Sequence, residues 1–368
     1  GMGMTEKQGG SDVRANTTRA TAIAADGPGE WYQLVGHKWF LSAPMCDAFL
    51  VLAQSARGLS CFLLPRFAPD GRVNAIRIQR LKDKLGDWSN ASSEVEFQGA
   101  LAQMIGEEGR GVATILEMVA LTRQDCMIGS SGVMRQALVQ AIHHARHRKA
   151  FGKLLIDQPL MRNVLADLAL ESEASMALTL RVARAVDRSP HDAAEAAFAR
   201  IATAIGKYWV CKRCPPFVNE AQECLGGAGY VEESILPRLY RQAPLNAIWE
   251  GSGNIQCLDV LRALAKEPAT RDALLAEYSS VKGVSALLDQ AVAALTKSIG
   301  EVEQLEVRSR GIVEQMAVCL QAAVLIQAGN GVVADAFCHG RLGSGTGRMF
   351  GAGVVEHAMA LVESTFLE

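Results

Sequence analysis

The segment IWEGSGNIQ, residues 248–256, places a single carboxylate, Glu250, between a large apolar pair and a Gly-Ser-Gly-Asn turn. Two roles compete for it. The carboxylate could cap the helix that the apolar spacing predicts over residues 254–266, because acidic side chains favour the first turn of a helix. It could also be a general base in a dry pocket, where desolvation raises the pKa of a carboxyl group. The spacing by itself favours the cap.

Two segments near the N-terminus offer contacts to a flat or phosphorylated ligand. Residues 1–12, GMGMTEKQGGSD, form a glycine-rich turn with hydroxyl side chains. This turn is either simple hairpin geometry or a place where backbone N–H groups meet a ligand. Residues 36–44, GHKWFLSAP, put Trp39 and Phe40 on opposite faces of a predicted strand. One of the two rings must therefore face outward, against helices or a cofactor.

Two segments farther along the chain leave similar alternatives open. Arg148 ends a basic run and precedes Phe151-Gly152, so it is either part of a solvated helix end or a clamp for phosphate. Residues 223–230, ECLGGAGY, contain the pair Gly226-Gly227. Such a pair allows a ligand to approach the backbone closely, or it simply ends a helix.

The composition indicates a globular chain without a strong overall charge. Its 368 residues are 49% hydrophobic and 21% charged, which suits two or three domains with real cores. A net charge of −2 gives no general attraction to nucleic acid or anionic lipid, so such a partner would need a local patch. The sequence has no apolar run of about 18 residues and no charged-then-apolar leader, so we expect no membrane segment.

Cysteine usage predicts a reducing compartment. Nine cysteines, an odd number at irregular spacing, argue for free thiols in a cytoplasmic protein. Cys211 and Cys214 form a C-x-x-C pair, but no second pair or nearby His completes a zinc site. Pro215-Pro216 follows at once, so we expect a helix end with two buried thiols and no metal.

Hydrophobic periodicity divides the chain into three domains. Residues 1–107 read as short strands between turns, which predicts a barrel or a sandwich. Residues 108–266 change to helical spacing and predict a bundle. Residues 267–368 are helical again, and form either an independent domain or an appendage to the bundle. Within them the glycine-rich segment 340–353 follows no strand, so a helix-to-helix loop is favoured over a phosphate loop.

These pieces, in this order, resemble the acyl-CoA dehydrogenase family over essentially the whole chain. The chain is most similar to the alkylation-response branch of this family, the AidB-like flavoproteins. The segments that carry this similarity are MTEKQGGSDV, LVGHKWF, LVLAQ, RLKDKLG, RLYR and IWEGSGNI. The resemblance implies an α+β multidomain fold with a middle β-barrel, a four-helix bundle of acyl-CoA dehydrogenase type and an extra C-terminal helical segment. It also implies FAD between barrel and bundle, in a homo-oligomer built as a dimer of dimers.

On this resemblance Glu250 matches the family's catalytic base, and Arg123 matches the arginine that orders base and substrate. A desolvated carboxylate suits removal of the weakly acidic α-proton of a thioester, while FAD takes the β-hydrogen as hydride. The positions implied for FAD binding are Met4, Thr5, Gly10, Ser11, Phe40, Leu41, Ser42, Arg148, Phe151, Gln158, Gly226, Gly227, Ile248, Trp249, Gly251, Ser252 and Asn254.

Departures from the family pattern favour weak activity. Lys7-Gln8-Gly9 stands where the family has Pro-Gly-Ala, and Glu223 replaces a glutamine near the cofactor. The family's N-terminal helical domain forms one wall of the acyl pocket, whereas this chain begins inside the barrel. The expected function is therefore weak α,β-dehydrogenation of a short or branched acyl-CoA. The alternatives are an ordinary short- or branched-chain acyl-CoA dehydrogenase and a truncated remnant without chemistry.

The alkylation-response branch also raises sequence-independent binding of duplex DNA. From Asp259 to the C-terminus, 9 Lys and Arg residues stand against 13 Asp and Glu residues, so the region is not basic. Composition favours an ordinary mixed surface, and only the resemblance supports a local patch. The candidate phosphate ligands are Arg262, Lys266, Arg271, Arg308, Arg310, Arg341 and Arg348.

Overall fold

The computed structural model describes residues 1–343 and 349–366, which fall into two compact units, residues 1–121 and 122–368. Helix α1 (Gly111–His147) passes through the boundary between the units. The change of hydrophobic periodicity predicted this boundary at 107/108 instead. The segments predicted as bundle and third domain share the second unit, so residues 267–368 belong to the same compact body as the bundle.

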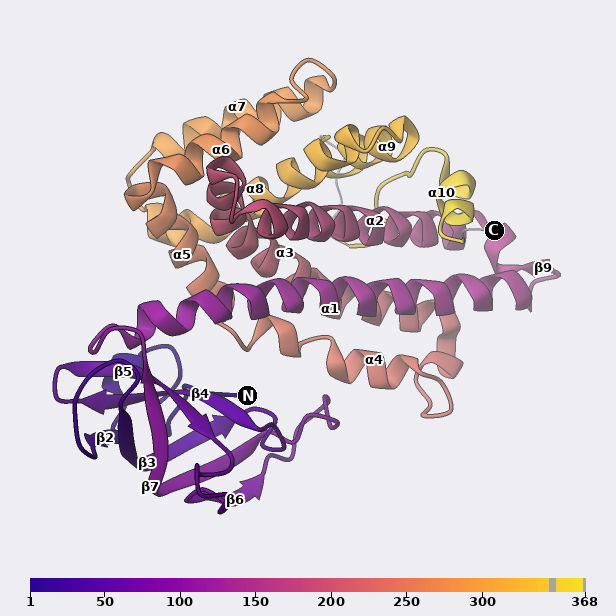
Figure 1. Ribbon diagram of the computed structural model, residues 1–368. Helices are drawn as coiled ribbons and strands as arrows, with labels where there is room; N and C mark the ends of the chain where they lie inside the picture. Colours follow the sequence, from indigo (N-terminus) through magenta and orange to yellow (C-terminus); the bar gives the residue numbers. More distant parts are fainter. Residues whose placement is uncertain (344–348, 367–368) are drawn as a thin grey trace. The chain divides into compact units, whose positions relative to one another are not determined.

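Unit 1 is a closed β-barrel, which is one of the two architectures that the strand pattern predicted (Figure 1). Its strands are β1 (Met2–Gly3), β2 (Arg19–Ala22), β3 (Trp31–Leu41), β4 (Ala48–Ser55), β5 (Gly58–Pro65), β6 (Ile76–Leu81) and β7 (Ser93–Ile105). The ring runs β4-β2-β3-β7-β5 and closes because β5 pairs with β4, while β1 joins β4 and β6 joins β7. Tyr32, Leu34, Phe49, Phe62 and Phe97 fill the interior, each at most 2% exposed.

A register shift in β3 changes the expectation for the two aromatic residues there. The pairing of β3 with β7 shifts between Lys38 and Leu41, which interrupts the alternation of side chains. Neither ring is buried, and the Lys82 ammonium lies 3.6 Å from the ring centroid of Trp39 and 4.4 Å from that of Phe40. Leu41 is 0% exposed and packs inside the barrel, so its side chain cannot contact a flavin.

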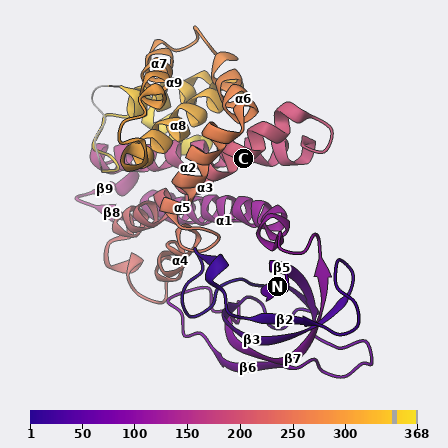
Figure 2. The same cartoon turned by 90° about the vertical axis from the view of Figure 1, so that its left-hand side faces the viewer.

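Unit 2 is helical. After α1 come a short hairpin of β8 (Lys149–Ala150) and β9 (Lys153–Leu154), then α2 (Pro159–Arg188), α3 (Ala193–Leu225), α4 (Leu236–Gln242) and α5 (Gly253–Lys266). The additional helices are α6 (Pro268–Ser279), α7 (Ala286–Gly300), α8 (Leu305–Gln327), α9 (Gly331–Leu342) and α10 (Ala358–Ser364). Helices α6 to α9 lie together over α2 and α3 (Figures 1 and 2). One continuous core includes the fully buried Leu138, Leu168, Ile205, Phe217 and Leu320.

Helix α3 continues through a point where the sequence predicted its end. Pro215 and Pro216 lie inside the helix, which ends only at Leu225. A proline removes one backbone donor and strains the preceding turn, but it does not stop a helix that tertiary packing supports on all sides. Cys211 and Cys214 are buried free thiols, and the Cys211 thiol contacts the backbone oxygen of Cys126 at 3.4 Å.

Helix α8 is the one helix in the described part of the chain with the length and apolar composition to cross a membrane. However, 72% of the apolar 18-residue stretch within this helix is buried in the structure. Its side chains contribute to the continuous core of unit 2. The same apolar composition is required of a central helix that other helices surround.

A buried charge cluster fastens the C-terminal segment to the bundle. It consists of Asp167 and Glu171 on α2, Arg213 on α3 and Arg341 on α9. The Arg341 guanidinium lies 2.6 Å from Asp167 Oδ1 and 3.2 Å from Glu171 Oε2, and Arg213 lies 3.0 Å from the same Glu171 oxygen. The backbone N–H of Gly351 also donates to Asp167 at 2.7 Å.

Two candidate phosphate ligands have partners within the chain. Arg341 is half-buried and pairs with both carboxylates of the charge cluster, which argues against a place on a DNA surface. Arg308 is also engaged, since it pairs with Glu301 at 2.9 Å and donates to the carbonyl oxygens of Ser298 and Glu301 at the end of α7. Arg348 and part of the glycine-rich segment 340–353 lie outside the described residues.

Candidate active site

Glu250 occupies a strained loop between the 3-10 turn Leu245–Ala247 and α5. Its backbone is left-handed, with φ +58°. Residues with a side chain rarely adopt this conformation, and it persists where the surroundings enforce it. The carboxylate accepts a hydrogen bond from the Thr122 hydroxyl at 3.0 Å. The N-cap of α5 is Ser252, and no side chain caps that helix, so the cap interpretation of Glu250 is wrong.

Burial raises the pKa of the Glu250 carboxyl above its ordinary value. The hydrogen bond from Thr122 and the positive charges of Lys207 and Arg123 act in the opposite direction, but desolvation prevails. A carboxylate with a raised pKa is a stronger base than a solvated one. The loop therefore presents the kind of group that proton abstraction near neutral pH requires.

Three side chains hold the backbone carbonyl groups of this loop. Lys207 Nζ donates to the oxygens of Trp249 at 2.6 Å and Gly251 at 2.5 Å. Gln256 Nε2 donates to the oxygens of Glu250 at 3.1 Å and Gly251 at 2.9 Å. Arg123 Nε donates to the Glu250 oxygen at 3.1 Å. Each of three consecutive carbonyl groups thus receives a donor from outside the loop or from the first turn of α5.

Arg123 acts on the backbone of Glu250 in this structure. Its guanidinium is held by Asp259 on α5, at 2.9 Å from Oδ2. Asp259 also pairs with Arg200 on α3 at 3.0 Å. The two arginines and the shared carboxylate connect α1, α3 and α5 around the loop. The sequence-based expectation that Arg123 orders the base is consistent with this arrangement, through the main chain of Glu250.

Thr122, Lys207 and Gln256 are site residues that the sequence pattern did not predict. Lys207 had a detectable signal, because it is the one charged residue in the stretch IATAIGKYWVC, residues 201–211 of α3. An ionised side chain in an apolar helix needs a buried partner or a function. Thr122 and Gln256 carry no comparable signal, since polar residues on helices usually face solvent.

The left-handed conformation of Glu250 leads to a stability prediction. Glu250→Gly should be more stable than Glu250→Ala by about 1 kcal/mol, because glycine adopts positive φ without strain. Urea denaturation of the two variants measures the difference. The same pair at Arg262, an exposed position inside α5, should show the opposite sign, with glycine less stable by up to about 1 kcal/mol. Equal stability of the two Glu250 variants would mean that the loop is unstrained.

The positions implied for FAD on unit 2 are mostly accessible. Phe151 is 98% exposed, lies in the β8–β9 turn at φ +52° and has the exposed Arg148 nearby in sequence. Gly226 and Gly227 have open space where a Cβ would stand. Gln158 donates to the oxygen of Ala150 at 3.2 Å and so supports that turn. An exposed ring, a guanidinium and an open glycine pair suit an adenine and a diphosphate.

The remaining implied positions fall in two places. Ile248, Ser252 and Asn254 are exposed on the Glu250 loop and the start of α5, with the half-buried Trp249 and Gly251 beside them. On unit 1, Phe40 is 45% exposed, and Ser42 Oγ accepts from the backbone N–H of Met2 at 2.9 Å. Met4, Thr5, Gly10 and Ser11 are exposed or half-buried. Apart from Leu41, these residues are at least partly exposed, and their assignment to FAD stays a prediction.

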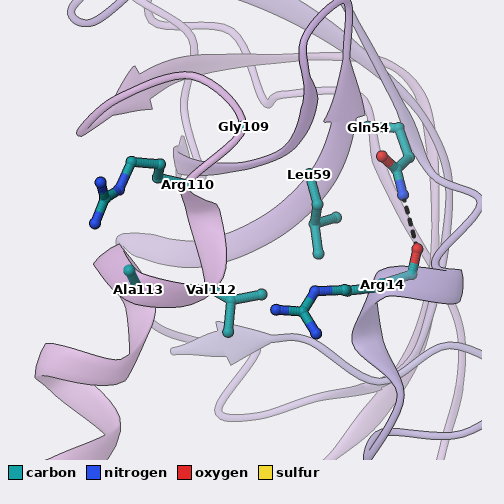
Figure 3. A pocket seen from close by; sticks show the side chains of 7 residues that line it. All are labelled: Arg14, Gln54, Leu59, Gly109, Arg110, Val112 and Ala113. Atoms are coloured by element: carbon teal, nitrogen blue, oxygen red, sulfur yellow. Dashed lines mark hydrogen bonds between the residues drawn. The ribbon is translucent and has the colours of Figure 1, made fainter. Parts of the chain in front are cut away.

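Unit 1 also has a hollow of about 450 Å³ that the sequence did not predict. It is lined by Arg14, Gln54, Leu59, Gly109, Arg110, Val112 and Ala113. Figure 3 shows the Arg14 side chain extended across it toward Val112, while Arg110 points away. The Gln54 amide donates to the backbone oxygen of Arg14 at 3.1 Å. None of the predicted site residues lines this hollow.

Comparison with known proteins identifies the family. The domain described as acyl-CoA dehydrogenase, middle domain, matches residues 1–100, and the acyl-CoA dehydrogenase, C-terminal domain, matches residues 109–265. The chain belongs to the acyl-CoA dehydrogenase family. This family is FAD-dependent, and the matched ranges include both the barrel and the Glu250 loop.

Individual relatives place the chain within the acyl-CoA dehydrogenase family. The putative acyl-CoA dehydrogenase AidB of Escherichia coli K12 is 53% identical over 339 residues, which are 92% of this chain and 61% of that protein. Caenorhabditis elegans ACDH-11, solved in complex with C11-CoA, is 30% identical with a TM-score of 0.83, over 99% of this chain and 68% of its own. The predicted AidB-like resemblance is confirmed.

A third relative, of lower sequence identity, shares the fold. A Bacillus anthracis acyl-CoA dehydrogenase complexed with FAD has a TM-score of 0.78 at 18% identity, over 99% of this chain and 67% of its own. At that identity the likeness concerns the fold. The present chain spans about three fifths of the length of the E. coli relative.

Proposed function

We propose that this chain is the barrel and bundle part of an FAD-dependent enzyme that removes the α- and β-hydrogens of a short or branched acyl-CoA at a low rate. The observation that carries the proposal is Glu250, a half-buried carboxylate of raised pKa in a loop whose backbone carbonyl groups are held by Lys207, Gln256 and Arg123. The C11-CoA bound to the C. elegans relative supports an acyl thioester as the ligand class.

The residues of the chain have separable tasks in this reaction. Glu250 accepts the α-proton of the thioester, and its desolvation favours that transfer. Thr122 donates to one carboxylate oxygen and fixes the orientation of the group. Arg123, held by Asp259, keeps the loop in place. FAD, when bound, supplies the acceptor for the β-hydrogen.

Reconstitution tests the proposal directly. The purified chain is titrated with FAD and then mixed anaerobically with butyryl-CoA, isovaleryl-CoA or undecanoyl-CoA. We expect FAD to bind and the visible absorbance of the oxidised flavin to decrease with at least one of the thioesters. Binding of FAD without reduction by any of them would favour an inactive remnant. Fast reduction by the short thioesters would favour an ordinary short- or branched-chain enzyme.

A second candidate function is sequence-independent binding of duplex DNA in an alkylation-damage response. Arg262, Lys266 and Arg271 are all exposed within ten residues across the junction of α5 and α6, and Arg310 is exposed on α8. Arg271 pairs with its neighbour Asp272, an exposed contact that phosphate could replace. Three clustered cations can contact phosphates without reading bases.

Replacing the cluster should weaken DNA binding in a salt-dependent way. The triple variant Arg262→Ala, Lys266→Ala, Arg271→Ala should lose affinity for every duplex. The slope of log K against log salt concentration should become shallower by the amount expected for about three phosphate contacts. Fluorescence anisotropy from about 50 to about 200 mM salt measures this. A control with Lys149, Lys153 and Arg238 replaced removes the same charge from β8, β9 and α4. Absence of binding by the unmodified chain at low salt would exclude this function.

We also propose how the chain assembles and where it is located. We expect a homo-oligomer organised as a dimer of dimers, which sedimentation at several concentrations would measure. All nine cysteines are free, and all but Cys46 are buried, which supports a reducing compartment such as the cytoplasm.

A further inference from the structure

We propose that Lys207 is a positioning residue that holds the Glu250 backbone in its left-handed conformation and so aims the carboxylate. This inference rests on the proposed function for the role of Glu250, while the contacts themselves are independent of it. Lys207 comes from the middle of α3, more than forty positions before the loop in sequence. Its side chain is enclosed, with 1% of its surface exposed.

The geometry shows how one ammonium group can fix this loop. The carbonyl of Trp249 belongs to the peptide plane that precedes Glu250, and the carbonyl of Gly251 belongs to the plane that follows Gly251. Lys207 binds both oxygens, at 2.6 and 2.5 Å. The plane between them carries the Glu250 oxygen, which Arg123 and Gln256 bind. With all three planes fixed, neither residue can leave its positive φ, which is +58° at Glu250 and +93° at Gly251.

The chemistry of the side chain explains why lysine suits this task. A buried ammonium has lost its water and must find acceptors, so it draws carbonyl oxygens inward more strongly than a neutral donor. Its flexible stem reaches across the space between α3 and the loop, and its three donors serve two carbonyls at once. The hydrogen bonds that satisfy the Lys207 ammonium therefore also stabilise the otherwise unfavourable backbone conformation of Glu250.

The pH dependence of the rate provides a second test of the proposal, because charged and titratable groups surround Glu250. Arg123 and Cys126 face it from α1, and Lys207 faces it from α3 with Cys211 nearby. The charge of Lys207 lowers the pKa of the Glu250 carboxyl, as does that of Arg123. Removing the ammonium should therefore raise this pKa further and move the acid limb of the rate–pH profile to higher pH. A residue that served only to fill space would leave that limb in place.

The test compares Lys207→Met, Lys207→Arg and the exposed control Lys282→Met in the FAD-loaded full chain. Hydrogen–deuterium exchange of the peptide covering residues 245–258 reports the loop directly. In Lys207→Met we expect exchange there to rise at least about tenfold, because two charge-assisted hydrogen bonds are lost. Flavin reduction by acyl-CoA should slow by about 10²-fold, as expected for a misaligned base. Lys207→Arg should recover part of both effects, and Lys282→Met should match the unmodified chain.

The outcomes separate this inference from the proposed function. Unchanged exchange and an unchanged acid limb in Lys207→Met would overturn the inference, even if the unmodified chain is an active dehydrogenase. Suppose that exchange is faster in Lys207→Met, but that no thioester reduces the flavin of the unmodified chain. This result would support the role of Lys207 in holding the loop and would refute the proposed function. If Lys207→Met fails to fold, Lys207→Gln keeps a polar donor without the charge, and the same two readouts decide.

Discussion

Glu250→Gln is expected to slow flavin reduction by acyl-CoA by about 10² to 10⁴-fold while FAD remains bound, since a general base contributes roughly that factor. The amide keeps the shape of the side chain and can still contact Thr122, but it cannot accept the α-proton. Anaerobic stopped-flow measurement of flavin reduction checks the rate, and the flavin absorbance checks occupancy.

A matched control exists on α3. Glu220 is another carboxyl group whose pKa is raised by burial, with a contribution from the nearby Glu223 and Asp167. Glu220→Gln should leave the rate of reduction unchanged, because this residue lies outside the loop. Reduction of the Glu250→Gln variant at the unmodified rate would place the base elsewhere.

The raised pKa of Glu250 also predicts the direction of two pH effects. Below that pKa the carboxyl is protonated and cannot act as a base, so the rate of the unmodified chain should fall as the pH decreases through it. In the folded state the ionised form is disfavoured relative to the unfolded chain. The free energy of unfolding should therefore decrease as pH rises from the ordinary carboxyl range to the raised value, a slope that Glu250→Gln removes.

Arg341→Ala is expected to lower the free energy of unfolding by about 3 to 5 kcal/mol, because breaking a buried ion pair leaves uncompensated charge. The substitution leaves Asp167, 5% exposed, without its guanidinium and leaves Glu171, 1% exposed, with Arg213 alone. Urea denaturation measures the loss. Arg262→Ala, which removes an exposed arginine from α5, should change stability by no more than about 0.5 kcal/mol.

The charge cluster should contribute less to the free energy of unfolding at acid pH. Burial by itself would raise the pKa of Glu171, but the guanidinium groups of Arg213 and Arg341 bring it below the ordinary value. The stabilisation is therefore complete above the ordinary glutamate pKa and is lost as the pH falls through the lowered one. The difference between the unmodified chain and Arg341→Ala should shrink over the same range. A variant as stable as the unmodified chain at neutral pH would return Arg341 to the candidate DNA surface.

The sequence by itself determined the elements and their class. Alternation in the first hundred residues specifies strands with one buried face, and the apolar spacing after Glu108 specifies helices, because both periods depend on neighbours within a single element. The position of Glu250 was also readable from IWEGSGNI and its resemblance to a family motif. The strand that carries Trp39 and Phe40 was also predicted, although its register shift was not.

Only the tertiary structure decided what surrounds those residues. Thr122 lies 128 positions from Glu250 and Lys207 lies 42 positions from Trp249, so no local pattern links them. Whether Glu250 caps a helix or carries a partly desolvated carboxylate depends on how α1, α3 and α5 pack around its loop. In the same way the sequence predicted Arg341 to be a surface cation, whereas α9 places it beside Asp167, 174 positions away. Burial and pairing of charge arise from contacts between elements, and these decide which of the charged residues can reach a ligand.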